Sequence, residues 1–334
     1  MRKIMIIVSG VVLLIAVAFY LYNRSDSNNE IKDTLQEIKS HYVNSETGMI
    51  HAYPEDMNSQ YLSESVGLYM EYLVKAKQKD LFAHYIDDFQ DQFIVKTDKD
   101  IFIRWELDEK AQVNALIDDL RIAAALQAAA KSFKKPAYDK LSKEIIEGIK
   151  HKQMTDGLTV DYYDWKADKP ASRITLSYLT RDYFENFKDK TREQELLKAA
   201  DKGNGNFFPE YYDVTKKQFI EQEEVHMVDQ LLIATNRAHL NIKSPQFLKW
   251  LKDKWQQDHK IYGRYSRTSG TSTVPYESLS VYYYMQQYCE AVGEGDMAAQ
   301  VQKRMNKLGG HGDEKGQHFF DYLHYRLMLL QNRK

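Results

Sequence analysis

Residues 60–77 read QYLSESVGLYMEYLVKAK, and the spacing of their apolar side chains indicates an amphipathic α-helix. The apolar positions recur every three or four residues, which is the period of one helix face: Leu62, Val66, Tyr69, Met70, Leu73 and Val74. The same period returns in residues 228–242 and 318–331. The chain is therefore expected to be built mainly of helices.

Counting every such stretch predicts about twelve helices. They are expected at residues 31–43, 60–77, 79–94, 114–133, 136–150, 174–188, 192–201, 228–242, 245–258, 276–292, 294–307 and 318–331. Residues 100–105 and 158–163 alternate polar and apolar side chains, so short strands are expected there.

The connections between these helices are of two kinds. Short turns join one helix to the next, as at residues 133–136, whereas long loops rich in Gly, Pro and aromatic residues fill 44–59, 95–113, 151–173, 202–227 and 259–275. This rhythm is that of a repeat of about fifty residues. We predict an all-α (α/α)6 barrel of six helical hairpins with its long loops on one face. An open superhelical solenoid of the same hairpins is the alternative.

The composition is that of a globular protein. The 334 residues are 43% hydrophobic and 28% charged, which allows one large core. The 46 basic and 48 acidic residues leave a formal charge of -2, so there is no electrostatic reason to expect a nucleic-acid partner. Cys289 is the single cysteine, and its apolar surroundings favour a small buried side chain over a nucleophile.

The N-terminus carries a targeting feature. Arg2 and Lys3 precede an uncharged, mainly apolar stretch, residues 4–22, that is long enough to span a bilayer. The basic end is expected to stay cytoplasmic, with the rest of the chain outside the cell. No small-x-small cleavage site follows, which favours a retained anchor over a cleaved signal peptide. We expect a single-pass anchor in residues 1–23, a polar linker in 24–30 and one helical domain in 31–334.

Acidic residues stand at the predicted starts of helices that follow long loops. Glu64 and Asp229 are far apart in the sequence, and hydrolysis of a sugar bond needs one carboxyl that donates a proton and another that activates water or attacks. Helix dipoles also favour acids there, so capping is the simpler explanation for any single acid. The shared placement of the whole set at one end of a ring favours a binding cleft, and its other members are Asp118, Asp119, Tyr178 and Glu277.

Aromatic residues are frequent in the long loops. The chain holds 24 Tyr and 14 Phe, and an aromatic face can stack on the apolar face of a pyranose. The loop rings expected near the acids are Trp105, Tyr162, Tyr163, Trp165, Tyr211 and Tyr212. Acids surrounded by such rings indicate a glycan cleft.

Four segments, in this order along the chain, resemble glycoside hydrolase family 8. They are Ser63-Glu64-x-x-Gly67-x-x-Met70, Asp118-Asp119-Leu120-x-Ile122-Ala123, Leu176-Ser177-Tyr178-Leu179-x-x-x-Tyr183-Phe184, and Phe208-Pro209-Glu210-Tyr211-Tyr212-Asp213 followed by Val228-Asp229. The resemblance implies an (α/α)6 barrel that cleaves β-1,4-linked glycans with inversion of the anomeric centre. With the anchor, it is closest to membrane-anchored hydrolases of exopolysaccharides, and an endo-acting enzyme is expected.

The resemblance also assigns roles. It implies that Glu64 is the general acid, that Asp119 holds the sugar at the cleavage point, and that Tyr178 is the tyrosine of the family's Ser-Tyr segment. Asp229 matches the general base of one subgroup. Where the family often continues Asp-Ala-x-Arg, residues 230–232 are Gln, Leu and Leu, and the arginine is absent.

An inverting pair needs room for a water molecule. The Glu64 and Asp229 carboxyls are therefore expected about 6.5 to 9.5 Å apart. Partial burial beside aromatic rings and another carboxylate should raise the pKa of Glu64, whereas Asp229 should stay ionised.

Neither a metal nor a cofactor is expected. His226 and the histidines between His311 and His318 could bind a cation, but the chain has no HExxH motif and no pair of cysteines. Arg173 is a candidate for binding an anionic or acetylated sugar, with a surface ion pair as the alternative.

Two further functional classes stay open beside an anchored hydrolase of a polysaccharide. A lyase or unsaturated-uronyl hydrolase on a similar barrel would need a Tyr or His base near Arg or Asn, or another acid pair. A non-catalytic glycan-binding or exopolysaccharide-biosynthesis accessory protein would combine stacking aromatics with a broken acid pair.

Overall fold

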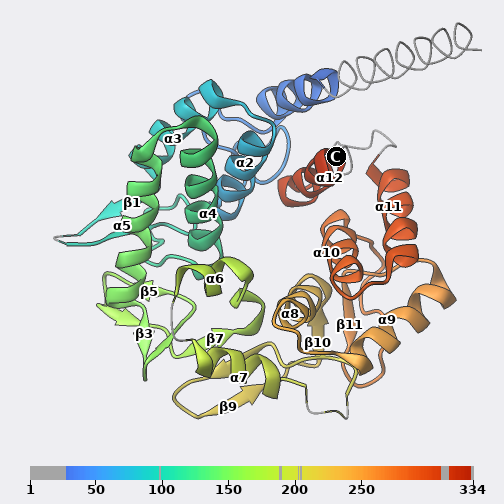
Figure 1. Cartoon of the computed structure of the whole chain (residues 1–334). Coiled ribbons are helices and arrows are strands. Elements are labelled where there is room, and N and C mark those ends of the chain that lie inside the picture. The colour runs from blue at the N-terminus through green and yellow to red at the C-terminus, as the bar shows by residue number, and fades with distance from the viewer. Residues whose placement is uncertain are drawn as a thin grey trace, which may run out of the picture.

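Two concentric rings of helices make up the described part of the chain, which in this computed structural model is residues 28–97, 99–187, 190–201, 203, 205–309 and 316–331 (Figure 1). The inner helices are α2 (Ser63–Lys75), α4 (Leu116–Phe133), α6 (Arg181–Asn186), α8 (Met227–His239), α10 (Leu279–Ala291) and α12 (Phe319–Gln331). The outer helices are residues 28–41, α3 (Lys79–Gln92), α5 (Pro136–Lys152), α7 (Thr191–Ala199), α9 (Pro245–Asp258) and α11 (Gly295–Gly309).

The inner ring is closed. Around it α2 contacts α4, α4 contacts α6, the 3-10 turn η1 (Leu176–Tyr178) before α6 contacts α8, α8 contacts α10, and α10 contacts α12. The last inner helix, α12, then contacts α2 (Figure 1). This contact joins the two ends of the repeat, which an open solenoid cannot do. The predicted (α/α)6 barrel is therefore confirmed and the solenoid is excluded.

The two rings differ in how much of each helix is buried. In the inner helix α10, ten of thirteen residues are buried, from Leu279 to Cys289. In the outer helix α11 the buried residues form a single stripe, Met297, Ala298, Val301 and Met305. Such a stripe is the pattern of a helix with one face in water, whereas a helix that is apolar nearly all round packs on every side.

The predicted helices agree with the observed ones except at residues 174–188. There the chain forms η1 and, separately, the short helix α6. The cause is local, because the Thr180 side chain accepts a hydrogen bond from the Tyr183 backbone N–H and starts a new helix.

The N-terminal predictions are only partly covered by the described residues. The predicted anchor, residues 1–23, lies outside them. The predicted linker, 24–30, ends too late, because residues 28–30 already belong to the first helix. Among the described residues, no helix has both the length and the apolar character needed to cross a membrane.

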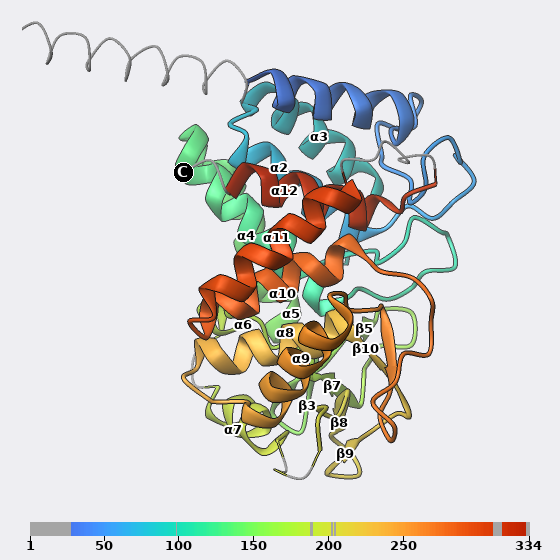
Figure 2. The ribbon, with the colours of Figure 1, turned by 90° about the vertical axis from the view of Figure 1, so that its right-hand side faces the viewer.

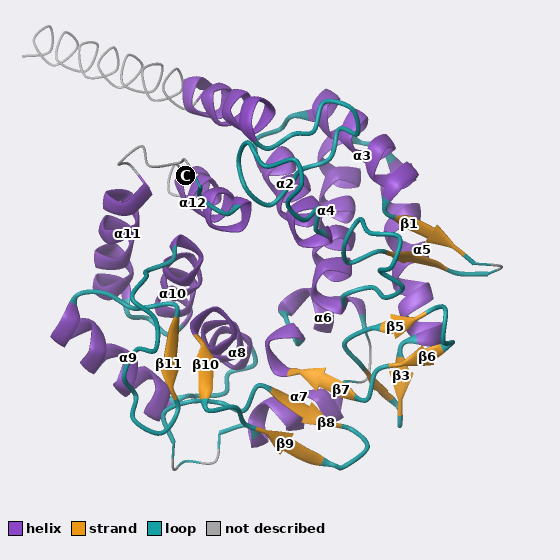
Figure 3. Ribbon diagram, turned by 180° about the vertical axis from the view of Figure 1, so that it is seen from behind, coloured by secondary structure: helices purple, strands orange, loops and turns teal. Residues whose placement is uncertain are grey.

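Short antiparallel strands decorate the loops (Figure 3). They are β1 (Ile94–Lys96), β2 (Ile101–Ile103), β3 (Met154–Thr155), β4 (Leu158–Thr159), β5 (Tyr163–Asp164), β6 (Lys169–Pro170), β7 (Arg173–Thr175), β8 (Tyr211–Asp213), β9 (Gln218–Ile220), β10 (Glu224–His226) and β11 (Arg264–Ser266). The strands expected within 100–105 and 158–163 correspond to β2 and β4. The long loops gather at one end of the barrel, on the right-hand side of Figure 2, and we call this end the mouth.

Candidate active site

Glu64 lies in the first turn of α2, at the mouth, and its side chain is partly exposed. Burial raises the pKa of Glu64 to about 8, and the negative charges of Asp118, Asp229 and Asp321 act in the same direction, whereas Arg121 opposes them. Desolvation and like charges both disfavour the ionised form of a carboxyl. Glu64 therefore carries its proton at neutral pH, as expected from the sequence.

Asp118 is the carboxylate that lies beside Glu64 from the neighbouring helix. It accepts hydrogen bonds from Ser63 Oγ at 3.0 Å and from Arg121 Nη1 at 2.9 Å. Burial raises the pKa of Asp118, and the charge of Arg121 and the bond from Ser63 act against that rise. Asp118 and Arg121 thus form an ion pair whose two charges lie close enough to Glu64 to affect its pKa.

Asp119, to which the family resemblance assigns the role of holding the sugar, has a different environment from Asp118. It is 1% exposed, and its Oδ2 accepts a hydrogen bond from Asn114 Nδ2 at 2.6 Å. Asn114 also bonds Gln153 Oε1 and accepts from the Tyr163 backbone N–H. These contacts tie Asp119 to the loop residue Asn114 and, through it, to Tyr163 of β5, and burial raises its pKa well above the ordinary range.

Asp229 lies in the first turn of α8, the helix that directly follows strand β10. Its Oδ1 accepts a hydrogen bond from Ser177 Oγ at 2.7 Å, and the side chain is partly exposed. In the ring of six inner helices, α8 is three places from α2 in either direction, so Glu64 and Asp229 start helices on opposite sides of the mouth (Figure 1).

Tyr178 lies between these two sides, at the end of η1. Burial raises its pKa, and so do the charges of Asp161, Asp118 and Asp229, while Arg173 lowers it. The Tyr178 hydroxyl is therefore protonated and close to carboxylates from α4 and α8. Such a hydroxyl can donate a hydrogen bond to a bound water or sugar oxygen.

Arg173 and Tyr211 lie against each other, and the charge of Arg173 reaches Tyr178. Arg173 Nε donates to Asp161 Oδ2 at 2.8 Å, and its guanidinium lies over the Tyr211 ring, 5.4 Å from the ring centre. Half of the Arg173 side chain is exposed, and the ion pair named as the alternative role for it is present. Tyr211 pairs with Thr175 across β7 and β8, on the same face as Arg173.

Tyr212 lies on the opposite face of β8. It pairs with Ile174 and Phe219, and its ring packs against Phe219 with a centroid distance of 5.3 Å. The structure thus separates the two neighbouring tyrosines that were expected to line the cleft together.

Trp105 lies beside the start of α2, where its carbonyl accepts the Ser63 backbone N–H at 2.9 Å. The ring lines a depression of about 590 Å³ together with Gln112 and Asp164. In the adjacent loop, Trp165 Nε1 donates to Gln112 Oε1 at 2.9 Å. Trp105 therefore lines a hollow and, through its carbonyl, also contacts Ser63, the residue before Glu64.

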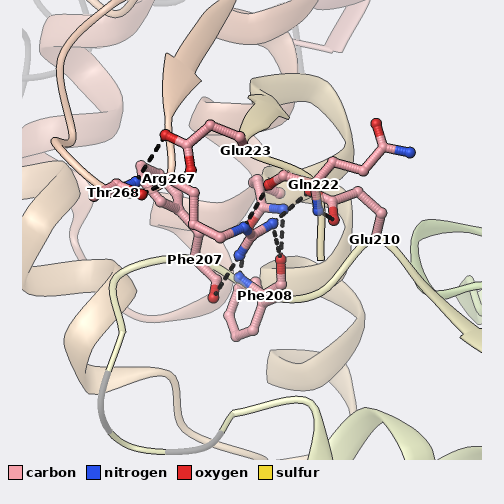
Figure 4. A network of polar contacts seen from close by, with 8 residues as sticks. Phe207, Phe208, Glu210, Gln222, Glu223, Arg267 and Thr268 are labelled. Atoms are coloured by element: carbon pink, nitrogen blue, oxygen red, sulfur yellow. Dashed lines mark hydrogen bonds and ion pairs between the residues drawn. The ribbon is translucent and has the colours of Figure 1, made fainter. Parts of the chain in front are cut away.

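The segment that leads into β8 is held by a polar network (Figure 4). Arg267 donates to the carbonyls of Phe208 at 2.9 Å and Gln222 at 2.7 Å, and it pairs with Glu210. Gln230, the residue after Asp229, bonds both the N–H and the carbonyl of Phe208, at 2.8 and 3.0 Å. At the place where the family often continues toward an arginine, this chain therefore has a buried clamp on the loop that carries Tyr211.

The sequence did not indicate two residues that influence the candidate acid, and it indicated one acid that is bound in another ion pair. The charges of Arg121 and Asp321 both shift the pKa of Glu64. In the sequence, Arg121 looks like an ordinary charged residue of a helix, and Asp321 comes near Glu64 only because the ring closes. Glu277 instead pairs with Arg304 of α11 and bonds Tyr282. Within the described part of the chain, no cluster of three or more His, Cys, Asp or Glu could hold a metal ion.

Comparisons with known proteins give one curated relative and several structures. "Putative lipoprotein YdaJ" of Bacillus subtilis (strain 168) is 30% identical over 315 residues, which cover 88% of this chain and 84% of that protein. The crystal structure of PssZ from Listeria monocytogenes superposes with a TM-score of 0.82 at 28% identity, over 89% of this chain and 94% of PssZ.

A more distant structure carries a family name. The endoglucanase Cel10 of Klebsiella pneumoniae, a family 8 glycosyl hydrolase, superposes with a TM-score of 0.62 at 13% identity, over 90% of this chain and 98% of that one. At this identity the likeness concerns the fold alone. No protein-family model matches the sequence.

Proposed function

Because the chain belongs to the family of "Putative lipoprotein YdaJ" and has the six-hairpin fold of glycoside hydrolase family 8, we propose that it is a membrane-anchored, extracellular hydrolase of β-1,4-type linkages in an exopolysaccharide. In this proposal Glu64 is the general acid and Asp229 is the general base of an inverting reaction. No cofactor takes part.

The observation that carries the proposal is the contrast between two carboxyls at one mouth. Glu64 has a pKa raised to about 8 by burial and neighbouring acids. Asp229, on the opposite side, is partly exposed and accepts a hydrogen bond from Ser177. A protonated donor and a hydrogen-bonded acceptor facing one space are the two groups that inverting hydrolysis needs.

The reaction follows from these roles. Glu64 gives its proton to the glycosidic oxygen as the bond from that oxygen to the anomeric carbon breaks. Asp229 takes a proton from a water molecule, whose oxygen attacks the anomeric carbon from the other face. Tyr178, whose hydroxyl is near Asp229, holds the water or the reacting sugar. The products are an alcohol and a hemiacetal of inverted configuration.

The residues around the mouth fit a polymer of sugars. Trp105 lines a hollow and contacts Ser63, and Tyr211 lies against Arg173, whose charge reaches Tyr178. The aromatic faces would stack on sugar rings, and Arg173 would bind an anionic or acetylated substituent. The lipoprotein name of the relative agrees with a place at the outer face of the membrane.

The test is the release of new reducing ends from soluble β-linked polymers such as derivatives of cellulose, xylan and chitosan, with starch as an α-linked comparison. We expect the wild type to release reducing ends from at least one β-linked polymer, and E64Q to be slower by about 10²- to 10⁴-fold. The matched control is E277Q, which changes another acid before an inner helix, one that is already paired with Arg304.

The outcomes separate the functional classes. Wild-type rates in E64Q would refute the assignment of the acid. Unsaturated products that absorb in the ultraviolet would identify a lyase, and binding without any cleavage would identify an accessory protein. For the inverting mechanism, NMR of fresh products should show the α-anomer first from a β-linked polymer.

A further inference from the structure

A mostly buried ion pair of α4 lies near the acid and contacts α2 at Ser63 and Gly67. Arg121 Nη1 is 2.9 Å from Asp118 Oδ1, and the two side chains are 13% and 11% exposed. A buried charge is costly unless it is paired and hydrogen-bonded, so the position of each group depends on the other. Neither residue has a role in the proton transfers proposed above.

The Arg121 side chain crosses α2 at Gly67, one turn after Glu64. A Cβ at position 67 would lie 3.1 Å from Arg121 Cδ and 3.2 Å from its Cγ. Any larger residue would push against the arginine stem. The glycine of the Glu64 segment therefore leaves the room in which Arg121 reaches Asp118.

The other Asp118 oxygen reaches the start of α2. Ser63 Oγ donates to Asp118 Oδ2 at 3.0 Å, and the Ser63 backbone N–H donates to the Trp105 carbonyl. Ser63 immediately precedes Glu64. The pair therefore connects α4 to Ser63, whose position fixes the backbone from which the Glu64 side chain extends.

The pair also brings one positive and one negative charge close to Glu64. The charged and titratable groups that face Glu64 come from four other inner helices: Asp118 and Arg121 of α4, Asp229 of α8, Tyr284 of α10 and Asp321 of α12. Arg121 stabilises the ionised form of Glu64, and Asp118 stabilises the protonated form. Removing the charge of Asp118 should therefore lower the pKa of Glu64, and removing the charge of Arg121 should raise it.

We propose that Arg121 and Asp118 are positioning residues for the general acid: together they fix the start of α2 and balance the charge around Glu64, so that it holds a proton and can still release it. This inference rests on the proposed function, because it concerns the acid of that reaction. Neither residue needs to touch the substrate.

The experiment measures kcat/KM against pH for the wild type, D118N, R121M, R121K and the double variant D118N/R121M. The alkaline limb of this profile reports the ionisation of the acid in the free enzyme. We expect D118N to move the limb to lower pH and R121M to move it to higher pH, each by about one unit. The double variant should lie between them, and kcat should fall by up to about 10²-fold where the start of α2 shifts.

Two variants guard against loss of folding. R121M leaves Asp118 buried without its partner, whereas the double variant leaves no unpaired charge and R121K keeps the positive charge. R121K should keep the wild-type limb with a lower kcat. R304M is the matched control, because Arg304 also pairs with a partly buried glutamate, Glu277, which does not act on Glu64. Limbs that move in the same direction in D118N and R121M, or do not move while kcat falls, would overturn the inference.

A second measurement separates this inference from the proposed function. If the wild type cleaves no polymer, the proposed function fails, but the ionisation of Glu64 can still be followed by unfolding. The difference in stability with and without E64Q, measured against pH in the D118N and R121M backgrounds, should level off at lower and higher pH than in the wild type, respectively. Equal pH values in all backgrounds would refute the pair's effect on Glu64.

Discussion

The two sides of the mouth place a carboxyl in different environments. On the α2 side, Glu64 has Asp321 and the Asp118–Arg121 ion pair near it, and its pKa is raised to about 8. On the α8 side, Asp229 has Ser177 as a hydrogen-bond donor and is open to water. Glu64 therefore retains its proton, whereas Asp229 serves as a hydrogen-bond acceptor.

The difference shows that position at a helix N-terminus does not fix the role of an acid. Both residues lie in the first turn of an inner helix, where the dipole favours negative charge equally. Burial and like charges outweigh that dipole at Glu64, because a carboxyl loses its hydration and gains repulsion there. The neighbours from other helices therefore decide which acid donates.

The strongest test of the comparison is D229N. It should lower kcat by about 10²- to 10⁴-fold and remove the acidic limb of the pH profile, because no group would accept the proton of the attacking water. E64Q should instead remove the alkaline limb. The measurement is kcat/KM against pH for both variants. Loss of the same limb in both would mean that the two sides do not have separate roles.

The next effect concerns stability. Glu64 has a pKa of about 8 in the folded protein against an ordinary value of 4.5, so the folded state holds a proton that the unfolded state loses. Its contribution is therefore present below about pH 4.5, is lost as the pH rises to about 8, and amounts to at most about 5 kcal/mol. E64Q should lose less stability than the wild type between these pH values in urea unfolding. Parallel pH curves for the two proteins would contradict the raised pKa.

A smaller effect is expected from S177A on the other side. A neutral donor bonded to a charged carboxylate contributes about 1.5 to 3 kcal/mol, so kcat should fall by about 10- to 10²-fold. S142A is the matched control, since Ser142 is buried and bonds the Ala123 carbonyl. The measurement is kcat from steady-state kinetics of S177A and S142A. Equal kcat values in the two variants would show that Ser177 does not orient Asp229.

The smallest effect concerns the rings of β8. Y211A should raise KM a few-fold, because one stacking ring contributes about 0.5 to 1.5 kcal/mol, with little change in stability. Y212A should lower stability instead and leave KM unchanged, since Tyr212 packs against Phe219. KM and urea midpoints for both variants check this. A raised KM in Y212A alone would reverse the assignment of the two faces.

The sequence predicted the helices well because their apolar spacing is a local property. The break within 174–188 depends on the capping contact of Thr180, which the period of three and four does not reveal. Closure of the ring and the nearness of Asp321 to Glu64 depend on contacts between the two ends of the chain. Such long-range contacts leave no mark in a periodic pattern.

The candidate site was predictable by segment more than by residue. The Glu64 and Asp229 segments do meet at one mouth, but neighbouring residues diverge by about 100° on a helix and point to opposite faces of a strand. Asp118 rather than Asp119 lies beside Glu64, and Tyr211 rather than Tyr212 lies beside Arg173. The exact register of each element is set by packing, which the segment alone does not specify.

The most direct measurement compares E64Q and D229N on two substrates, the natural polymer type and an oligosaccharide with an activated dinitrophenyl leaving group. Such a leaving group departs without a proton, so only the base is needed. If Glu64 donates the proton and Asp229 activates water, E64Q recovers most of the wild-type rate on the activated substrate and D229N does not. If E64Q lost activity equally on both substrates, or if D229N kept full activity on either substrate, this division of roles would be contradicted.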